Sequence, residues 1–287
     1  MNLLKYWKTL ALVSGLALWY NFNDFSHDKI SSFQRYPLPS EIKVAGTTLP
    51  YETRNGKFGL EKIVKTEDID FSKDFEIETE RYHLVKDNDW LPSRLVGHVF
   101  SVPAKLIFWD SDFGWGLDEE KSRAVLSMLE KNKDLKDLTI RINHNEAFYD
   151  WYRMMFNDVL RERNPFLYRL GIGTFGTLGS EVWGEFFRGD YYNPLTKTVV
   201  LYSNIEAISA HELGHHKDFS RFDTDWLYSL SKFIPFVVLN HEGRASLNAK
   251  EIMAKEDEWQ FDRYLIPAFF TYALGSIPLA KKYYDFF

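Results

Sequence analysis

His211-Glu212-Leu213-Gly214-His215 lies within residues 204–219, a stretch whose composition allows one continuous helix. Residues four apart lie on the same face of a helix, one turn apart, so the two imidazoles can converge on a single cation. Glu212 projects about 100° around the helix axis from His211 and can reach a water beside that cation. The spacing predicts two metal ligands and one general base, the arrangement that metal-assisted hydrolysis needs. An exposed polar helix face is the alternative explanation.

A zinc site needs a third protein ligand, and the residues after the motif restrict where it comes from. In H-E-x-x-H-x-x-G-x-x-H the third ligand is a histidine, but here Asp218 and Arg221 replace that glycine and that histidine. The other common third ligand is a glutamate from a second helix, which Glu242 can supply. Glu251 and His241 are the alternative candidates for the third ligand. If one of them binds the metal, Glu242 is a solvated residue at a helix start.

The segment Glu242-Gly243-Arg244-Ala245 resembles the E-x-x-A-D helix of gluzincin metallopeptidases, such as the prenyl-protein endoproteases and their bacterial relatives. The resemblance implies a zincin fold with Glu242 as the third ligand. Ser246 stands where the family has an aspartate that orients a ligand histidine. Ser246, Asn248 or Asp218 can take over that task, and the sequence does not choose among them. Small residues in this segment would let its helix approach the first one closely.

The residues before the motif extend the resemblance to residues 189–249, which look like an uncharacterised bacterial family of zinc metallopeptidases. Residues 189–196 have turn composition, and residues 197–202 are rich in β-branched residues and predict a strand. In zincin domains such a strand leads into the first helix and forms a sheet edge, beside which the substrate adds as a further strand. The resemblance therefore implies a peptide or protein substrate beside residues 198–202.

Composition narrows the class of protein. The chain has 287 residues, of which 45% are hydrophobic and 17% aromatic, so there is ample material for a core. The charged fraction of 26% argues against a disordered chain, and the net charge of −6 argues against a nucleic-acid binder. The absence of cysteine excludes disulfides, thiolate ligands and a cysteine nucleophile. A metal must then be held by histidine and carboxylate groups.

Residues 1–23 have the layout of a secretory signal, because two lysines precede an apolar run over residues 9–20. No small-x-small cleavage site follows cleanly, which favours an uncleaved membrane anchor over a removed signal peptide. An amphipathic helix packed on the domain is the alternative. We expect a membrane-anchored or secreted protein of a bacterial envelope, with residues 24–94 as an extension and residues 95–287 as an extracytoplasmic catalytic domain.

Within that domain the residue patterns predict strands over 104–109 and 138–142 and helices over 118–132 and 146–161. The buried stripe expected on the first helix is Val125, Leu126 and Leu129. The apolar side expected on the second helix is Phe148, Tyr152, Met155, Phe156 and Val159. Together with residues 197–202 they predict an α+β fold with a small mixed sheet, a helix carrying the motif and a helical C-terminal part.

Three other stretches have alternative explanations. Residues 171–176 match G-x-G-x-x-G, but no clear strand precedes them, so a glycine-rich turn or close-packed apolar segment is the better explanation. The apolar runs 226–239 and 264–280 are short for membrane spans. Because prolines interrupt the second run, we expect a buried core helix there, and membrane association is the alternative.

The sequence thus predicts a zinc-dependent peptidase in which His211, His215 and Glu242 hold Zn²⁺ and Glu212 is the general base. The candidates to stabilise the oxyanion are Tyr192, Tyr202, His216, His241 and Arg244. Two alternatives remain. One is a metal-binding module without peptidase activity, and the other is a membrane-associated scaffold with an incidental motif.

Overall fold

The computed structural model describes residues 42–44, 47–49, 51–56, 59–64, 69–87, 91–181, 184, 187–222, 224–232, 234–253 and 255–274. The chain divides into two units, Met1–Pro37 and Leu38–Phe287, and all described residues belong to the second. The predicted signal or anchor, residues 1–23, lies outside the described residues. The end of the apolar run 264–280, from residue 275 onward, also lies outside them.

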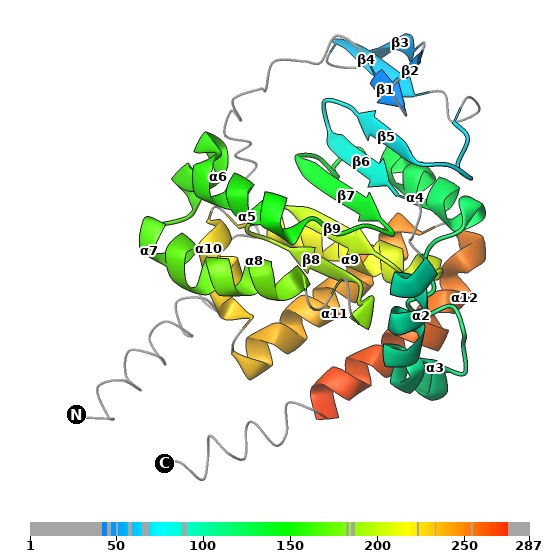
Figure 1. Cartoon of the computed structure of the whole chain (residues 1–287), viewed down its shortest axis with the longest axis vertical. Helices are drawn as coiled ribbons and strands as arrows, with labels where there is room; N and C mark the ends of the chain where they lie inside the picture. Colours follow the sequence, from blue (N-terminus) through cyan, green and yellow to red (C-terminus); the bar gives the residue numbers. More distant parts are fainter. Residues whose placement is uncertain are drawn as a thin grey trace. The chain divides into compact units, whose positions relative to one another are not determined.

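The described part of the chain has an α+β fold built on a five-stranded mixed sheet (Figure 1). Its strand order is β5-β6-β7-β9-β8, and β6, β7 and β9 run parallel while β5 and β8 pair antiparallel at the two edges. The bounds are β5 Phe75–Glu78, β6 Tyr82–Lys86, β7 Leu138–Ile142, β8 Tyr191–Asn193 and β9 Thr198–Leu201. Two separate antiparallel hairpins precede it, β1 Ile42–Val44 with β2 Thr47–Leu49 and β3 Tyr51–Gly56 with β4 Gly59–Val64.

Helices form most of the connections between the strands of this sheet. They also make up most of the described chain after β9. Between β6 and β8 they are α2 Leu91–Phe100, α3 Val102–Phe108, α4 Glu119–Lys131, α5 Ala147–Phe156, α6 Asp158–Arg163, α7 Phe166–Tyr168, the π-helix η3 Arg169–Gly173 and α8 Thr174–Glu181. After β9 they are α9 Glu206–Phe219, α10 Asp225–Ser231, α11 Pro235–Ile252, the 3₁₀ turn η5 Lys255–Asp257, α12 Glu258–Gln260 and the π-helix η6 Phe261–Leu265. Residues 266–274 continue as a helix.

The hydrophobic core joins the sheet to helices α4, α9 and α11. Leu138, Ile140 and Ile142 of β7 belong to this core. Arg141, between them, faces the opposite side of the sheet, because side chains alternate along a strand. There its guanidinium donates two hydrogen bonds, of 2.9 and 3.0 Å, to the buried carboxylate of Asp150 in α5. Both faces of the sheet are therefore covered, and a buried ion pair positions α5.

Two of the predicted elements are confirmed. The helix predicted over residues 118–132 is α4, and the strand over residues 138–142 is β7. The Asp118 side chain caps α4 by accepting a 2.9 Å hydrogen bond from the backbone N–H of Lys121. The stripe expected to be buried on α4 is fully buried, and it comprises Val125, Leu126 and Leu129.

The strand predicted over residues 104–109 is wrong, because these residues belong to helix α3 and its C-terminal cap. A short apolar run does not distinguish a strand from a helix. Pro103 lies in the first turn of α3, where a missing backbone N–H costs nothing. The helix ends at Trp109, whose φ of 50° is in the left-handed region.

The single helix predicted over residues 146–161 is also wrong. Two helices, α5 and α6, meet at Asn157, whose side chain accepts hydrogen bonds from the backbone N–H groups of Val159 and Leu160 at 3.1 and 3.2 Å. This cap starts a second helix in a new direction.

Of the apolar side predicted for this helix, Phe148, Tyr152 and Phe156 are exposed, and Met155 and Val159 are half-buried. α5 instead buries Ala147, Asp150 and Met154. The ion pair of Asp150 with Arg141 of β7 holds this side of α5 against the sheet.

The boundary predicted between residues 24–94 and 95–287 does not separate an extension from the fold. Residues 75–86 of that range supply β5 and β6, two strands of the central sheet. Phe75, Ile77 and Leu84 are part of the same core as α4 and α9.

The glycine-rich stretch and the two apolar runs are helical in the described residues. Residues 171–176 continue from η3 into α8 and form no turn. The run 226–239 covers α10 and the start of α11. In the run 264–280, Tyr264 and Leu265 belong to the core, whereas Phe270 and Leu274 are exposed, so only the start of its described part is buried as expected. No helix within the described ranges is long and apolar enough to cross a membrane.

Candidate metal centre

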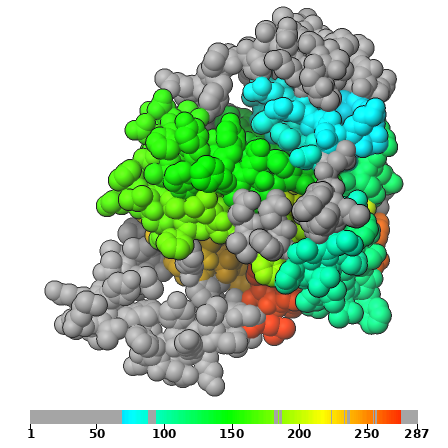
Figure 2. Space-filling view, in the orientation of Figure 1, coloured from blue at the N-terminus to red at the C-terminus, as the bar shows by residue number. Residues whose placement is uncertain are grey.

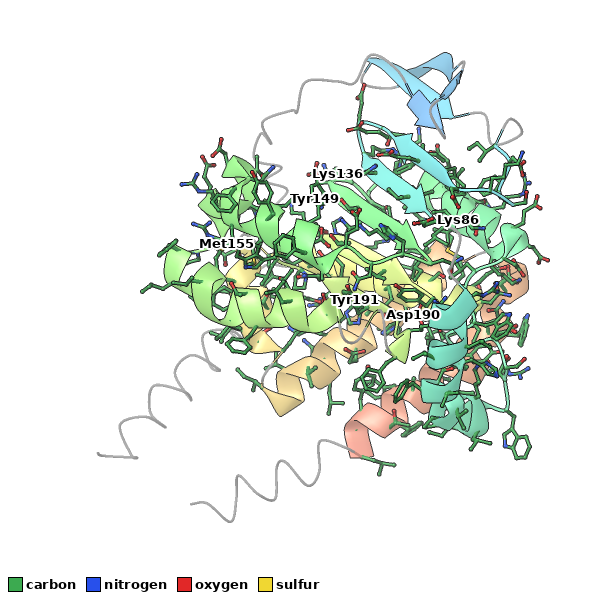
Figure 3. All side chains as sticks on the ribbon, viewed as in Figure 1. Lys86, Lys136, Tyr149, Met155, Asp190 and Tyr191 are labelled. Atoms are coloured by element: carbon green, nitrogen blue, oxygen red, sulfur yellow. The ribbon has the colours of Figure 1, made fainter. Side chains whose placement is uncertain are left out.

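Helix α9 carries the H-E-x-x-H motif and begins two residues later than predicted, at Glu206. Asp190, which precedes β8 (Figure 3), holds the chain just before this helix. Its Oδ1 accepts hydrogen bonds from the backbone N–H groups of Tyr202 and Ser203 at 2.6 and 2.9 Å. Burial raises the pKa of Asp190, although these hydrogen bonds oppose the shift. The connection from β9 to α9 is thus tied to the edge strand.

Helices α9 and α11 pack closely at Gly214. A Cβ at this position would lie 2.3 Å from the carbonyl oxygen of Ala245 and 3.2 Å from the backbone nitrogen of Ala249. The Asn248 amide donates a 2.9 Å hydrogen bond to the carbonyl of Gly214. The small residues of α11 lie at this contact, as predicted, and the contact places Glu242 of α11 opposite the histidines of α9.

We expect Gly214→Ala to destabilise the protein by about 1–3 kcal/mol, because the added methyl group must displace the backbone of α11. Thermal unfolding with and without metal measures this. The matched control is Gly176→Ala in α8, where a Cβ would meet no atom within 4 Å. We expect this control to be neutral or to stabilise by about 1 kcal/mol at most. Equal stability of the two variants would contradict the close contact.

His211, His215 and Glu242 form a cluster in which one ligand atom of each residue lies within 4.8 Å of the others. Glu242 Oε2 is 3.2 Å from His211 Nε2 and 3.5 Å from His215 Nε2. Two ligand atoms of a tetrahedral ion with bonds of about 2.1 Å are about 3.4 Å apart. The two distances to Glu242 match this separation, so the three side chains could hold a metal ion.

The protonation states of His215 and Glu242 suit a cation, because metal ligands must be deprotonated. Burial lowers the pKa of His215 to about 4, so its imidazole is neutral at pH 7. Burial opposes ionisation of Glu242, but the neighbouring His215 and His211 outweigh it and hold the pKa of this carboxyl well below its usual range. For His211, burial acts to lower the pKa, but Glu242 and Glu212 raise it overall.

Glu212 is buried beside this cluster but is not one of its three members. Burial raises the pKa of Glu212 to about 7, and the charges of Glu242 and Asp190 add to the shift. His211 and Lys232 act in the opposite direction. A carboxyl group with a pKa near neutrality can accept a proton and return it.

Of the three candidates to orient a ligand histidine, Ser246 is the one that contacts such a histidine. Its Oγ lies 3.3 Å from His211 Nδ1. Asp218 instead accepts from His241, and Asn248 binds the α9 backbone. Within the described residues, the buried Nδ1 of His215 has no hydrogen-bond partner.

We expect Ser246→Ala to weaken metal binding by about 10-fold, because the imidazole of His211 loses the hydroxyl that orients it. Competition with a zinc-binding dye measures the affinity. Ser231→Ala is the matched control, because Ser231 is equally buried and its Oγ lies 2.7 Å from a ring nitrogen of His241. A similar loss of affinity in both variants would argue against an orienting role for Ser246.

The two alternative third ligands lie outside the cluster. His241 uses both ring nitrogens, with Nδ1 2.8 Å from Asp218 Oδ2 and Nε2 2.7 Å from Ser231 Oγ. Glu251 is exposed and forms a 2.9 Å ion pair with Lys217.

The five oxyanion candidates are engaged elsewhere. The Tyr192 hydroxyl is 3.1 Å from His216 Nδ1, and His216 Nε2 donates to the carbonyl of Lys136 at 2.8 Å. The Arg188 guanidinium lies 4.4 Å from the centre of the Tyr202 ring. Both remaining candidates, His241 and Arg244, pair with Asp218.

The structure adds one cation that sequence reasoning missed. Lys232, which ends α10, has its Nζ 5.5 Å from the centre of the Tyr228 ring and 5.9 Å from that of Tyr192. Burial lowers the pKa of Lys232, while the carboxylates of Glu242 and Glu212 act to raise it. The sequence feature that could have identified Lys232 is that it is the one charged residue in the apolar run 226–239.

The predicted position of an added substrate strand is wrong. β9 already pairs with β7 on one side and, over residues 198–200, with β8 on the other, so these residues have no free edge. The edge strand is β8, which lies in the stretch predicted as a turn and is only three residues long. Composition did not reveal so short a strand.

No family model, no curated protein and no solved structure matches this chain. Its function has to be inferred from the side chains described above.

Proposed function

We propose that the protein is a zinc-dependent peptidase of zincin-like fold, with His211, His215 and Glu242 as the zinc ligands. The observation that carries the proposal is the convergence of these three ligand atoms, from two helices, within 4.8 Å of one another. Two imidazoles and one carboxylate are the protein ligands of one type of catalytic zinc site, which keeps a further position open. A bound zinc ion would lower the pKa of a water at that position and polarise a carbonyl group.

Glu212 is the general base in this proposal. Its buried carboxylate takes a proton from the attacking water and delivers it to the nitrogen of the leaving amine. The pKa of about 7 suits both steps, because the group changes protonation state near neutral pH.

We place an extended substrate beside β8, the edge strand that contacts α9. A peptide that adds to this edge would use backbone hydrogen bonds for affinity, so cleavage would depend weakly on sequence. The antiparallel pairing of β8 with β9 brings this edge next to the helix that carries the motif.

Lys232 is our candidate to stabilise the oxyanion. We expect Lys232→Met to lower kcat about 10²-fold with little loss of metal, because a positive charge beside the reacting carbonyl disappears. Lys217→Met is the matched control, since Lys217 lies on α9 but pairs with Glu251 and Asp134 away from the cluster. Equal rates for the two variants would exclude Lys232 from this role.

The proposal is tested with the purified full chain and a mixed peptide library, with mass spectrometry as readout. We expect cleavage when zinc is bound, loss of cleavage after chelation, and recovery when zinc is returned. Stoichiometric zinc with no cleavage would point to the metal-binding module. A zinc content near zero under saturating zinc would point to the scaffold with an incidental motif.

A further inference from the structure

Helices α2 and α3 expose several large apolar side chains to solvent. α3 has no buried residue, although it is apolar except for Lys105. The exposed fractions are 65% for Val99, 64% for Leu106, 60% for Ile107 and 86% for Trp109. We call this region, residues 95–109, the α2–α3 surface. Contiguous exposed apolar side chains on this scale mark interaction sites.

The α2–α3 surface continues onto the helix of residues 266–274. The ring of Phe108 lies 6.2 Å from that of Tyr264, whose hydroxyl donates a hydrogen bond to Asp110. The helix that follows Tyr264 exposes Phe270 and Leu274. Figure 2 shows the two segments, teal and red, next to each other on one face.

Helices α2 and α3 carry cations and no acidic side chain. Residues 91–109 contain Arg94 and Lys105 but no acidic residue, in a chain whose 41 acidic residues outnumber its 35 lysines and arginines. Asp110, which follows directly, pairs with Arg263. A second exposed apolar surface, on α5 to α8, differs in charge, because its helix α6 contains the acidic residues Asp158 and Glu162.

This combination fits an anionic lipid surface. Aliphatic and aromatic side chains enter the boundary between headgroups and acyl chains, and lysine and arginine reach the lipid phosphates. A two-fold dimer through α2 and α3 would bring the cations of one protomer against those of the other, because neither helix carries an acidic residue.

We propose that the α2–α3 surface, together with residues 266–274, docks onto an anionic lipid bilayer and lies in its interface. The inference uses none of the residues of the metal cluster and goes beyond the proposed peptidase. It also does not depend on residues 1–23.

The absence of cysteine allows a direct test on the full chain. Leu106→Cys and Val99→Cys are each labelled with the fluorophore NBD and mixed with vesicles of phosphatidylcholine and phosphatidylglycerol. We expect a blue shift, an increase in intensity of at least about twofold, and quenching by spin-labelled lipids. Glu119→Cys on α4 and Leu167→Cys on α7 are the controls, both at exposed sites, and we expect neither to respond.

Five outcomes would overturn the proposal. The chain does not bind the vesicles, or it binds while the labels at 99 and 106 remain unchanged. The label at 167 responds in place of that at 106, which would assign docking to the other apolar surface. The label at 106 shifts without vesicles and increasingly with protein concentration, which would indicate contact between copies of the chain. The response is as large on pure phosphatidylcholine, which would remove the role of the cations.

Discussion

Glu212→Gln is expected to keep its metal and to lose about 10³-fold in kcat, the range that a positioned acid–base group contributes. The amide has nearly the shape of the carboxyl group, so the packing of α9 is preserved. It cannot take up a proton from water, and Glu212 is not among the three clustered ligands. Peptide cleavage by the zinc-loaded variant and its metal content by mass spectrometry measure the two expectations separately.

The control is Glu251→Gln, the same chemical change at an exposed residue of α11 that pairs with Lys217. This variant should cleave peptides at the rate of the unmodified protein. Cleavage by zinc-loaded Glu212→Gln at that same rate would remove Glu212 from the mechanism. Loss of metal together with activity would instead make Glu212 a ligand.

Glu242→Gln is expected to weaken zinc binding by about 10²–10³-fold. Structural zinc sites bind with about 10–16 kcal/mol, so one of three or four ligands carries about 3–4 kcal/mol. The substitution also removes a negative charge that lies within 3.5 Å of both imidazoles. Titration against a zinc-binding dye gives the affinity, and His215→Ala should give a loss of similar size.

Glu251→Gln serves again as the control, because Glu251 was the alternative carboxylate ligand on the same helix. Its affinity for zinc should be unchanged. If Glu251→Gln lost the metal and Glu242→Gln kept it, the cluster would not be the binding site, and the proposed peptidase would lose its basis.

The elements that the sequence predicted well are those with a local signal. α4 has a capping Asp118 and a buried stripe at helical spacing, and α9 has the H-E-x-x-H motif on one helix face. Glu242 was predicted through a resemblance in four residues, and the structure brings it to the two histidines. A short motif sufficed here because helical geometry determines where its side chains point.

The predictions that failed needed knowledge of neighbours. α3 and a short apolar strand have the same composition, and only Pro103 in its first turn hints at the helix. The exposed side of α5 follows from the ion pair of Arg141 with Asp150, residues of two different elements. Lys232 lies at the end of α10, and its Nζ lies near the ring of Tyr192 in β8, so its position depends on how these two elements pack.

By itself, the sequence determined that the imidazoles of His211 and His215 lie about one helical turn apart with Glu212 beside them, because 3.6 residues complete a turn. The tertiary structure decided which distant carboxylate meets them and which edge strand of the sheet contacts their helix. Both depend on the contact of α9 with α11 at Gly214 and on the pairing of β8 with β9. Such contacts join residues far apart in the chain, and their free energy comes from complementary packing of surfaces that no local pattern encodes.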